Sequence, residues 1–265
     1  MFDYHMHTSF SADSEAPMEE MVQSAIQKQL KEICFTEHID YDYPDPSIVF
    51  DFSYDDYSVK IEEMQQKYGE QLSIKKGVEI GLQPHLYDKY RSYIQQHAFD
   101  FVICSLHTVE NGSLHYREIF KNRTNEEAFR TYYEELYSII QQFNDYDVLG
   151  HVDLIKRYTK EPVQHLFHEE LGEIFKRVIH EGKGIELNTS GLRYKLSHNL
   201  PSPDVLKLYY DLGGKIITLG SDAHHPKDIG FHFKESLDLL ESIGFEHIAT
   251  FNKRQPTLHR IRDLR

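Results

Sequence analysis

Residues 17–40, PMEEMVQSAIQKQLKEICFTEHID, contain the pattern that decides the fold. Apolar residues recur at helical spacing through residues 17–29, and the proline that begins them suits the first turn of a helix. A short apolar run at residues 32–35 then has the length and composition of a buried strand. The strand leads into His38, a side chain able to bind metal. The stretch predicts one helix-strand unit of an α/β fold.

The same alternation runs along the rest of the chain. Strands are expected at residues 1–4, 32–35, 72–78, 99–104, 147–149, 184–187 and 214–219, with a weaker eighth pattern at 247–251. Helices are expected at residues 17–29, 54–68, 84–96, 125–143, 162–180, 203–212 and 226–243. Seven such units predict a parallel sheet that closes into a barrel of the TIM-barrel type. Because neither a low-complexity linker nor a repeat divides the sequence, residues 1–265 are expected to form one domain.

The composition excludes several classes of protein. Hydrophobic residues make up 40% of the 265, enough for a sizeable core, which excludes a fully disordered chain. There are 43 acidic residues against 29 Lys and Arg, a net charge of −14, which argues against partners such as nucleic acid or an anionic membrane. No apolar run approaches the roughly 20 residues that span a bilayer, and the first residues lack the pattern of a signal peptide.

The two cysteines, Cys34 and Cys104, each lie in a short apolar run that is expected to be a buried strand. Buried, reduced thiols of this kind are typical of cytoplasmic proteins. A cytoplasmic location is therefore expected, with both thiols in the core and neither at a functional site.

Histidine is unusually frequent, with 17 residues, and several follow predicted strands. His5 and His7 stand two apart on the first strand, so their side chains point to the same side. Most of the other strands also lead into a histidine or a carboxylate: His38, Glu79, His107, His151, Asp222 and His224, with Asp13 in the loop after the first strand. A barrel brings the carboxyl ends of its strands together, so these nine side chains are expected to form one metal centre.

Nine ligands exceed the three or four that one zinc ion uses, which predicts two to three divalent ions if a carboxylate bridges them. Nitrogen and oxygen ligands without a thiolate favour Zn, Mn or Fe over calcium. The other eleven histidines fall mostly in predicted helices and loops, where solvated side chains explain them. His225, beside His224, is the exception.

Two arginines are expected at the same rim of the barrel. Arg157 follows the fifth strand and Arg193 follows the sixth. The planar guanidinium matches phosphate oxygens, so the pair predicts a small phosphate ester as substrate in spite of the acidic surface. Two long connections, after His38 and after His107, are rich in aromatic residues and are expected to form ordered lids.

Taken together, the segments HMHTSFSAD (5–13), TEHID (36–40), SLH (105–107), GHVD (150–153) and SDAHH (221–225), with the lone Glu79, resemble the polymerase and histidinol phosphatase (PHP) superfamily. The long segment after His38, GHVDLIKRY (150–158) and NTSGLR (188–193) are similar to its bacterial histidinol-phosphatase branch. The resemblance implies a distorted (β/α)7 barrel.

The resemblance also implies three metal sites: His5, His7, Glu79 and Asp222; Glu79, His107 and His151; and Asp13, His38 and His224. In this pattern Glu79 bridges the first two ions. Some relatives have histidine where this chain has Asp13, which is expected to affect the choice of metal at the third site.

The implied reaction is the hydrolysis of L-histidinol phosphate, with a metal-bound hydroxide as the nucleophile. Arg157 and Arg193 would bind the phosphate. Asp153, His225 or a metal-bound water would protonate the leaving oxygen, and the sequence does not choose among them. Glu110, Asp42 and the tyrosines of the lids are candidates for recognising the imidazole and the ammonium. The sequence makes no prediction of oligomeric state.

Three alternatives remain open at this point. A phosphoesterase of the same superfamily would act on phosphotyrosine or small nucleotides. An amidohydrolase-type deaminase shares the His5-x-His7 pattern, but that class usually bridges its metals with a lysine after the fourth strand, where this chain has His107. A non-enzymatic metal-binding protein would have no use for two arginines beside open metal ligands.

Overall fold

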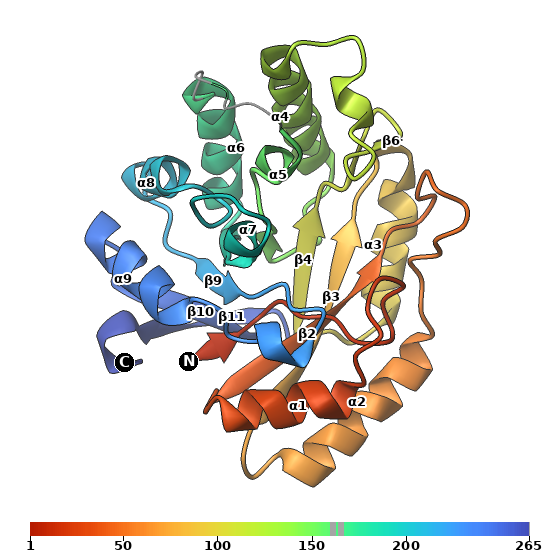
Figure 1. The fold of residues 1–265 in the computed structure, drawn as a ribbon, viewed down its shortest axis with the longest axis vertical. Helices are drawn as coiled ribbons and strands as arrows, with labels where there is room; N and C mark the ends of the chain where they lie inside the picture. Colours follow the sequence, from red (N-terminus) through yellow and green to blue (C-terminus); the bar gives the residue numbers. More distant parts are fainter. Residues whose placement is uncertain (160–162, 164–166, 265) are drawn as a thin grey trace.

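The structure, a computed structural model, describes residues 1–159, 163 and 167–264. Its centre is a sheet of seven parallel strands in the order β1-β2-β3-β4-β7-β8-β9, surrounded by helices (Figure 1). The strands are β1 Phe2–Asp3, β2 Glu32–Ile39, β3 Ser73–Gly81, β4 Phe101–Ser105, β7 Val148–Leu149, β8 Gly184–Asn188 and β9 Ile217–Gly220. Side chains of the sheet are almost all buried on both faces, as in other parallel sheets covered by helices.

Backbone hydrogen bonds between the first and last strands bring the sheet round into a barrel. The N–H of Tyr4 donates to the carbonyl of Leu219 at 2.9 Å, and the N–H of Asp222 donates to the carbonyl of His5 at 2.8 Å. The N–H of His7 donates to the carbonyl of Ala223 at 2.9 Å. The predicted fold class is therefore confirmed, and the ends of β1 and β9 lie side by side.

The helices form where local signals predict them. Thr124 and Glu127 form a capping box at the start of α4, and Ser53 caps α2. In α6 the apolar positions Leu171, Ile174 and Val178 are buried at helical spacing. The helices are α1 Met18–Gln27, α2 Tyr54–Tyr68, α3 Tyr87–Gln96, α4 Asn125–Gln142, α5 Ile155–Tyr158, α6 His168–His180, α7 Ser190–Arg193, α8 Pro203–Asp211 and α9 Phe233–Ile243. No described helix combines the length and apolar character needed to cross a membrane.

Two predicted helices differ from those observed. The pattern at 226–243 splits into a 3-10 turn, Pro226–Asp228, and α9, because the backbone is left-handed at Gly230 and His232. The described part of the helix expected at 162–180 begins only at His168, after a left-handed Phe167. Residues 160–162 and 164–166 lie outside the described part of the chain.

The strand expected at 247–251 exists but does not join the barrel. Strand β10, His247–Asn252, pairs antiparallel with β11, Gln255–Arg260, in a separate hairpin. The hairpin lies beside the amino end of β1 (Figure 1), where the Tyr4 hydroxyl donates to the Phe251 carbonyl and accepts from the Phe251 N–H. It therefore packs at the end of the barrel opposite the predicted metal ligands.

The two long connections at the carboxyl ends of the strands are ordered against each other. Residues 40–53 link β2 to α2, while the connection after β4 contains the short strands β5 Thr108–Val109 and β6 Gly112–Ser113 and the 3-10 turn Glu118–Phe120. The Tyr43 hydroxyl lies 2.8 Å from Ser113 Oγ, and Tyr116 hydrogen bonds to Asp45. These contacts join the first connection to the second.

The fold generates a prediction about Cys34 and Cys104, which are free and buried, with burial raising the pKa of both thiols. Replacing either by serine places a poorly paired hydroxyl in the core, which is expected to lower the free energy of unfolding by about 1–3 kcal/mol. Urea denaturation measures this loss, and elemental analysis is expected to find the metal content unchanged. A serine variant that lost metal would show that the thiol serves the metal centre.

Candidate metal centre and active site

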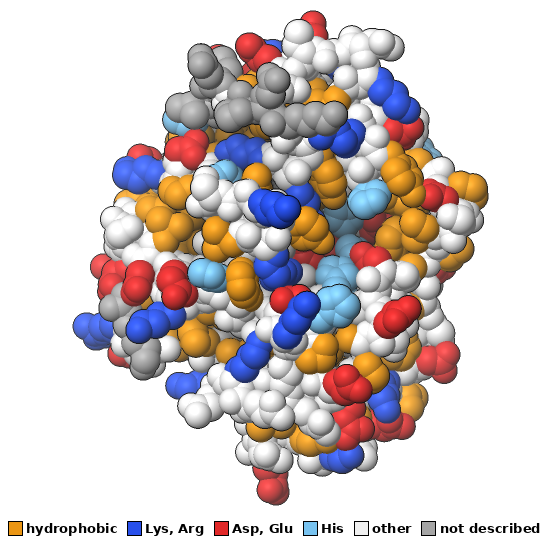
Figure 2. Space-filling model, viewed as in Figure 1, with side chains coloured by type: hydrophobic (Ala, Val, Ile, Leu, Met, Phe, Trp, Pro, Cys, Tyr) orange, Lys and Arg blue, Asp and Glu red, His pale blue; other side chains and the backbone are white. Residues whose placement is uncertain are grey.

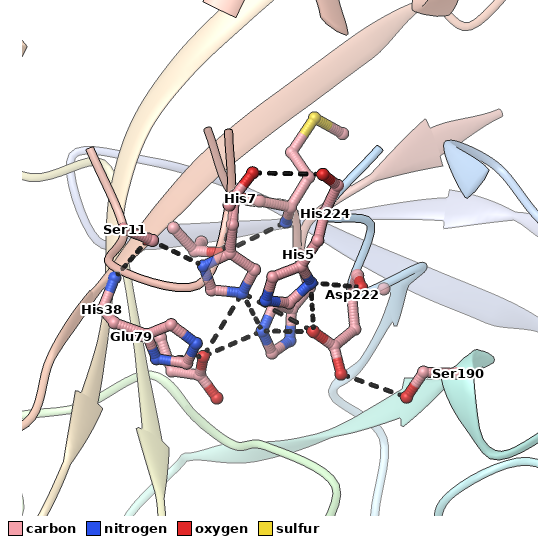
Figure 3. Close-up of polar contacts among 12 residues, drawn as sticks. His5, His7, Ser11, His38, Glu79, Ser190, Asp222 and His224 are labelled. Carbon is pink, nitrogen blue, oxygen red and sulfur yellow. Dashed lines mark hydrogen bonds and ion pairs between the residues drawn. The ribbon is translucent and has the colours of Figure 1, made fainter. Parts of the chain in front are cut away.

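The carboxyl ends of the barrel strands surround a cavity of about 450 Å³. Figure 2 shows histidines gathered in a hollow near the centre of one face, with charged and hydrophobic side chains around it. Seven of the nine predicted ligands line this cavity: Asp13, His38, Glu79, His107, His151, Asp222 and His224. His5 and His7 are fully buried, and both contact Glu79 of that set (Figure 3). The prediction that the nine side chains meet at one end of the barrel therefore agrees with their observed positions.

Glu79, from β3, lies at the centre of the cluster. Its Oε2 is 3.0 Å from His5 Nε2 and 3.5 Å from His7 Nε2. Its Oε1 is 3.0 Å from His151 Nε2 and 3.4 Å from His107 Nε2. Oε2 also lies 3.2 Å from His38 Nδ1. The two oxygens thus face different sets of imidazoles, which is the geometry required of a bridging carboxylate.

The other two carboxylates, Asp222 and Asp13, each lie beside two histidines of the cluster. Asp222 Oδ1 lies 3.8 Å from His5 Nε2 and 3.6 Å from His7 Nε2. Asp13 Oδ2 lies 3.2 Å from His224 Nε2 and 3.6 Å from His38 Nε2. Asp13 is the most exposed of the nine, with 41% of its side chain accessible. The proposed third metal site, which contains Asp13, is therefore the one nearest to solvent.

The arrangement fits bound cations. His5 Nε2 and His7 Nε2 face each other at 3.1 Å, an approach of two nitrogens that a shared positive ion would satisfy. Three overlapping groups have ligand atoms within 4.8 Å of one another: His7, His38 and His224; His5, His7 and Asp222; and His38, Glu79 and His107. Asp13 and His151 lie outside these three groups and adjoin them through His224 and Glu79.

The charges of the cluster are mutually dependent. Burial raises the pKa of Glu79, but the surrounding histidines outweigh burial and hold that pKa well below its ordinary value. The pKa of Asp222 is lowered in the same way. Burial, reinforced by neighbouring histidines, holds the pKa of His7 well below its usual range. An ionised carboxylate and a neutral imidazole are the protonation states that bind metal. The carboxylates around His5 and His107 raise the pKa of both imidazoles, so a bound ion must displace a proton from each of these two.

Two ligands sit on unusual backbone. His151 has φ of 20° and Asp222 has φ of 54°, a region that residues other than glycine rarely adopt. Each is held by a hydrogen bond from its N–H: His151 to Glu186 Oε2 at 2.9 Å, and Asp222 to the His5 carbonyl. With these strained conformations, both side chains line the cavity.

Two carboxylates that were not predicted as site residues contact the Nδ1 atoms of His5 and His107. Glu186 Oε1 is 2.6 Å from His5 Nδ1, and Asp40 Oδ2 is 2.6 Å from His107 Nδ1. None of the nine proposed ligands came from the predicted strand at 184–187, yet Glu186 lies inside it. A charged residue within the apolar run GIELN (184–188) is the signal that would have identified it.

Both predicted arginines reach the cavity. A terminal nitrogen of Arg157 donates to Ser190 Oγ at 2.5 Å and lies 3.4 Å from Asp222 Oδ2. A terminal nitrogen of Arg193 donates to the Asp222 carbonyl at 2.7 Å. Arg157 Nε and Arg193 Nη1 are buried without a hydrogen-bond partner in the described residues. Two guanidinium groups with unused donors beside the metal ligands form a site for an anion.

Of the predicted proton donors and substrate-recognition residues, only some reach the cavity. His225 lines the cavity, whereas Asp153 does not: its Oδ2 contacts Lys156 Nζ at 2.9 Å and accepts from the Ser202 N–H at 3.0 Å. Glu110 pairs with Arg123 and Asp42 with His85, so these carboxylates are engaged away from the cavity lining.

His115, which was grouped with the solvated histidines, is exposed, and it also lines the cavity. It does so because the connection after β4 folds back over the strand ends. The apolar part of the lining comes mainly from both long connections and from the segment after β7: Tyr43, Ile48, Phe50, Leu114, Leu154 and Tyr158. These side chains form an apolar wall of the cavity, beside the metal ligands and the arginines.

Comparison with known proteins shows the family to which the chain is related. The family model described as "PHP domain" matches residues 3–190. The chain is 32% identical to a histidinol-phosphatase of Lactococcus lactis over 94% of both chains, and 31% identical to a probable histidinol-phosphatase of Clostridium acetobutylicum over 96% of this chain and 98% of that one. A crystal structure of the Lactococcus lactis histidinol phosphate phosphatase, complexed with zinc, L-histidinol and phosphate, matches with a TM-score of 0.87 at 32% identity, covering 97% of this chain and 98% of that chain.

The cluster generates a prediction that compares Glu79 with Asp13. Alanine at Glu79 removes a carboxylate that faces five histidines, so it is expected to lower bound metal more than alanine at Asp13, which contacts two. Elemental analysis of both variants, purified without chelator, measures the difference. Equal and small losses in the two variants would show that Glu79 does not bridge.

Proposed function

Because the chain belongs to the PHP domain family and to its histidinol-phosphatase members, we propose that it hydrolyses L-histidinol phosphate to L-histidinol and phosphate. The resemblance read from the motifs is confirmed, and so is the predicted enzyme class. The observation that carries the substrate proposal is one cavity lined by seven of the nine proposed metal ligands, by Arg157 and Arg193, and by an apolar wall. Its dimensions suit a small phosphate ester.

We assign two to three divalent ions, Zn, Mn or Fe, to the cluster. The residue sets are those implied by the family resemblance, with Glu79 between the first two sites. When bound, the ions supply positive charge to the phosphate oxygens and activate water for attack on phosphorus. Elemental analysis of protein never exposed to chelator is expected to find two to three ions in each chain.

The side chains of this chain orient the substrate. Arg157 and Arg193 bind the phosphate oxygens that face away from the ligand cluster. Their positive charges stabilise the phosphate more strongly as negative charge develops in the transition state. The apolar wall formed by both long connections packs against the rest of the substrate and reduces the access of water to the reacting phosphate.

The leaving oxygen needs a proton. Of the two predicted side-chain donors, His225 lines the cavity, whereas Asp153 is occupied by Lys156 and the Ser202 N–H. We therefore assign proton donation to His225. We also propose a cytoplasmic location, which the two buried free thiols support.

A phosphate-release assay tests the substrate proposal. L-Histidinol phosphate, phosphotyrosine and a nucleoside monophosphate are compared at equal concentration with metal-replete protein. The largest kcat/KM is expected for L-histidinol phosphate, because the apolar wall suits its imidazole. Preferential hydrolysis of phosphotyrosine or of the nucleotide would replace this proposal with another phosphoesterase activity, and no phosphate release from any of them would reopen the deaminase alternative.

The arginines generate a separate prediction. A charged hydrogen bond to a shielded phosphate contributes about 1.5–3 kcal/mol, so Arg157→Ala and Arg193→Ala are each expected to lower kcat/KM roughly tenfold to a hundredfold. Lysine is expected to restore part of the loss, since it keeps the charge without the planar fork. Inorganic phosphate is expected to inhibit both alanine variants less than the parent. Parental turnover together with parental inhibition by phosphate in both variants would contradict the assignment.

A further inference from the structure

The carboxylate of Glu186, on β8, lies behind the ligand cluster and contacts two of the predicted ligands. We propose that Glu186 is a positioning residue, which holds the His5 ring and the His151 backbone in the arrangement that binds metal. The proposal rests on the proposed metal-dependent function and deepens it. It concerns a residue that contacts neither the substrate nor the ions.

Three donors converge on this one side chain, which is only 1% exposed. Its Oε1 lies 2.6 Å from His5 Nδ1. Its Oε2 accepts from the His151 N–H at 2.9 Å and from Asn188 Nδ2 at 3.1 Å. A carboxylate inside an apolar strand is costly to bury, and these donors offset that cost. Both oxygens are therefore in use, each toward a different metal ligand.

The contact with His5 determines which ring nitrogen carries the proton and which can bind a metal ion. A proton on Nδ1 is donated to Glu186, which leaves the lone pair on Nε2. His5 Nε2 is the atom that faces Glu79 Oε2 at 3.0 Å and His7 Nε2 at 3.1 Å. Glu186 thus selects the tautomer whose lone pair points into the cluster.

The contact with His151 acts on the backbone. His151 has φ of 20°, a conformation that costs free energy for any residue with a Cβ. The hydrogen bond from its N–H to Glu186 Oε2 offsets this cost and keeps the ring directed at Glu79 Oε1, 3.0 Å from its Nε2. Through one carboxylate, the same residue fixes ligands from the first and the fifth strands of the barrel.

The neighbouring strand leaves room for this pair. Gly220, at the end of β9, lies against both partners: a Cβ at this position would overlap Glu186 Oε1 and would lie 2.6 Å from His5 Cβ. The φ of Gly220 is not in the left-handed region, so close approach rather than backbone conformation explains the glycine here. The space is shaped around the contact between Glu186 and His5.

The test is Glu186→Gln, which keeps the shape of the side chain and leaves a single acceptor oxygen. That oxygen cannot serve both His5 Nδ1 and the His151 N–H. If the amide nitrogen faces His5, it donates to Nδ1 and moves the ring proton to Nε2, where it blocks the ligand atom. Affinity for Zn²⁺, titrated against a chromophoric chelator, is expected to fall by roughly 10- to 100-fold. Nitrogen NMR of the imidazoles is expected to show His5 protonated at Nε2 before Zn²⁺ is added.

Asp147→Asn is the matched control. Asp147 is a buried carboxylate before the amino end of β7, where it accepts from the Val102 N–H and from Arg254. Its loss is expected to lower the melting temperature of the chelator-treated protein with Zn²⁺ affinity unchanged. Glu186→Gln is expected to show the opposite pattern, a large loss of affinity with a smaller change in melting temperature.

Parental Zn²⁺ affinity in Glu186→Gln would overturn the proposal, and so would equal losses of affinity in Glu186→Gln and Asp147→Asn. If Glu186→Gln does not fold, Glu186→Asp takes its place, since it withdraws both oxygens by one methylene. Weakened Zn²⁺ binding in Glu186→Asp supports the proposal, and parental binding overturns it. Failure of the parent to hydrolyse L-histidinol phosphate while these Zn²⁺ results hold would remove only the proposed substrate.

Discussion

Closure of the barrel between its first and last strands is the constraint on which the rest of the site depends. The backbone hydrogen bonds from Tyr4 to Leu219 and from Asp222 to His5 join segments more than 200 residues apart in the chain. They set His5 and His7 beside Asp222, and the intervening strands then bring Glu79 to the same point. Without this closure the ligands would lie along an open sheet edge, too far apart to share an ion.

Closure concentrates like groups, and the resulting electrostatic cost is offset locally. Burial disfavours charge on Glu79 and Asp222, yet the imidazoles around them keep both pKa values low. The outer carboxylates Glu186 and Asp40 do the converse for His5 and His107, whose pKa values they raise against the effect of burial. Acids and imidazoles thus stabilise one another in the cluster, except at His7, which lies among other imidazoles that lower its pKa.

The reactive face and the stabilising face of the barrel are separate. The hairpin of β10 and β11 packs at the amino ends of the strands, where Tyr4 and Phe251 exchange hydrogen bonds. The connections after β2 and β4 occupy the other end, where Tyr43 and Ser113 join them. The site can therefore combine a rigid floor of ligands with walls built from loops, a division typical of barrel enzymes.

The meeting of the nine proposed ligands and both arginines at one end of the barrel was predictable from the sequence, because strand alternation is a local pattern and barrel topology gathers every strand end at one face. The roles of Glu186, Asp40 and His115, and the burial of Asp153 against Lys156, were not readable in this way. Glu186 faces His5 across 181 residues of sequence, and Asp40 faces His107 across 67. Which side chain a buried carboxylate faces depends on strand register, barrel closure and the space left by residues such as Gly220, and only the tertiary structure determines these.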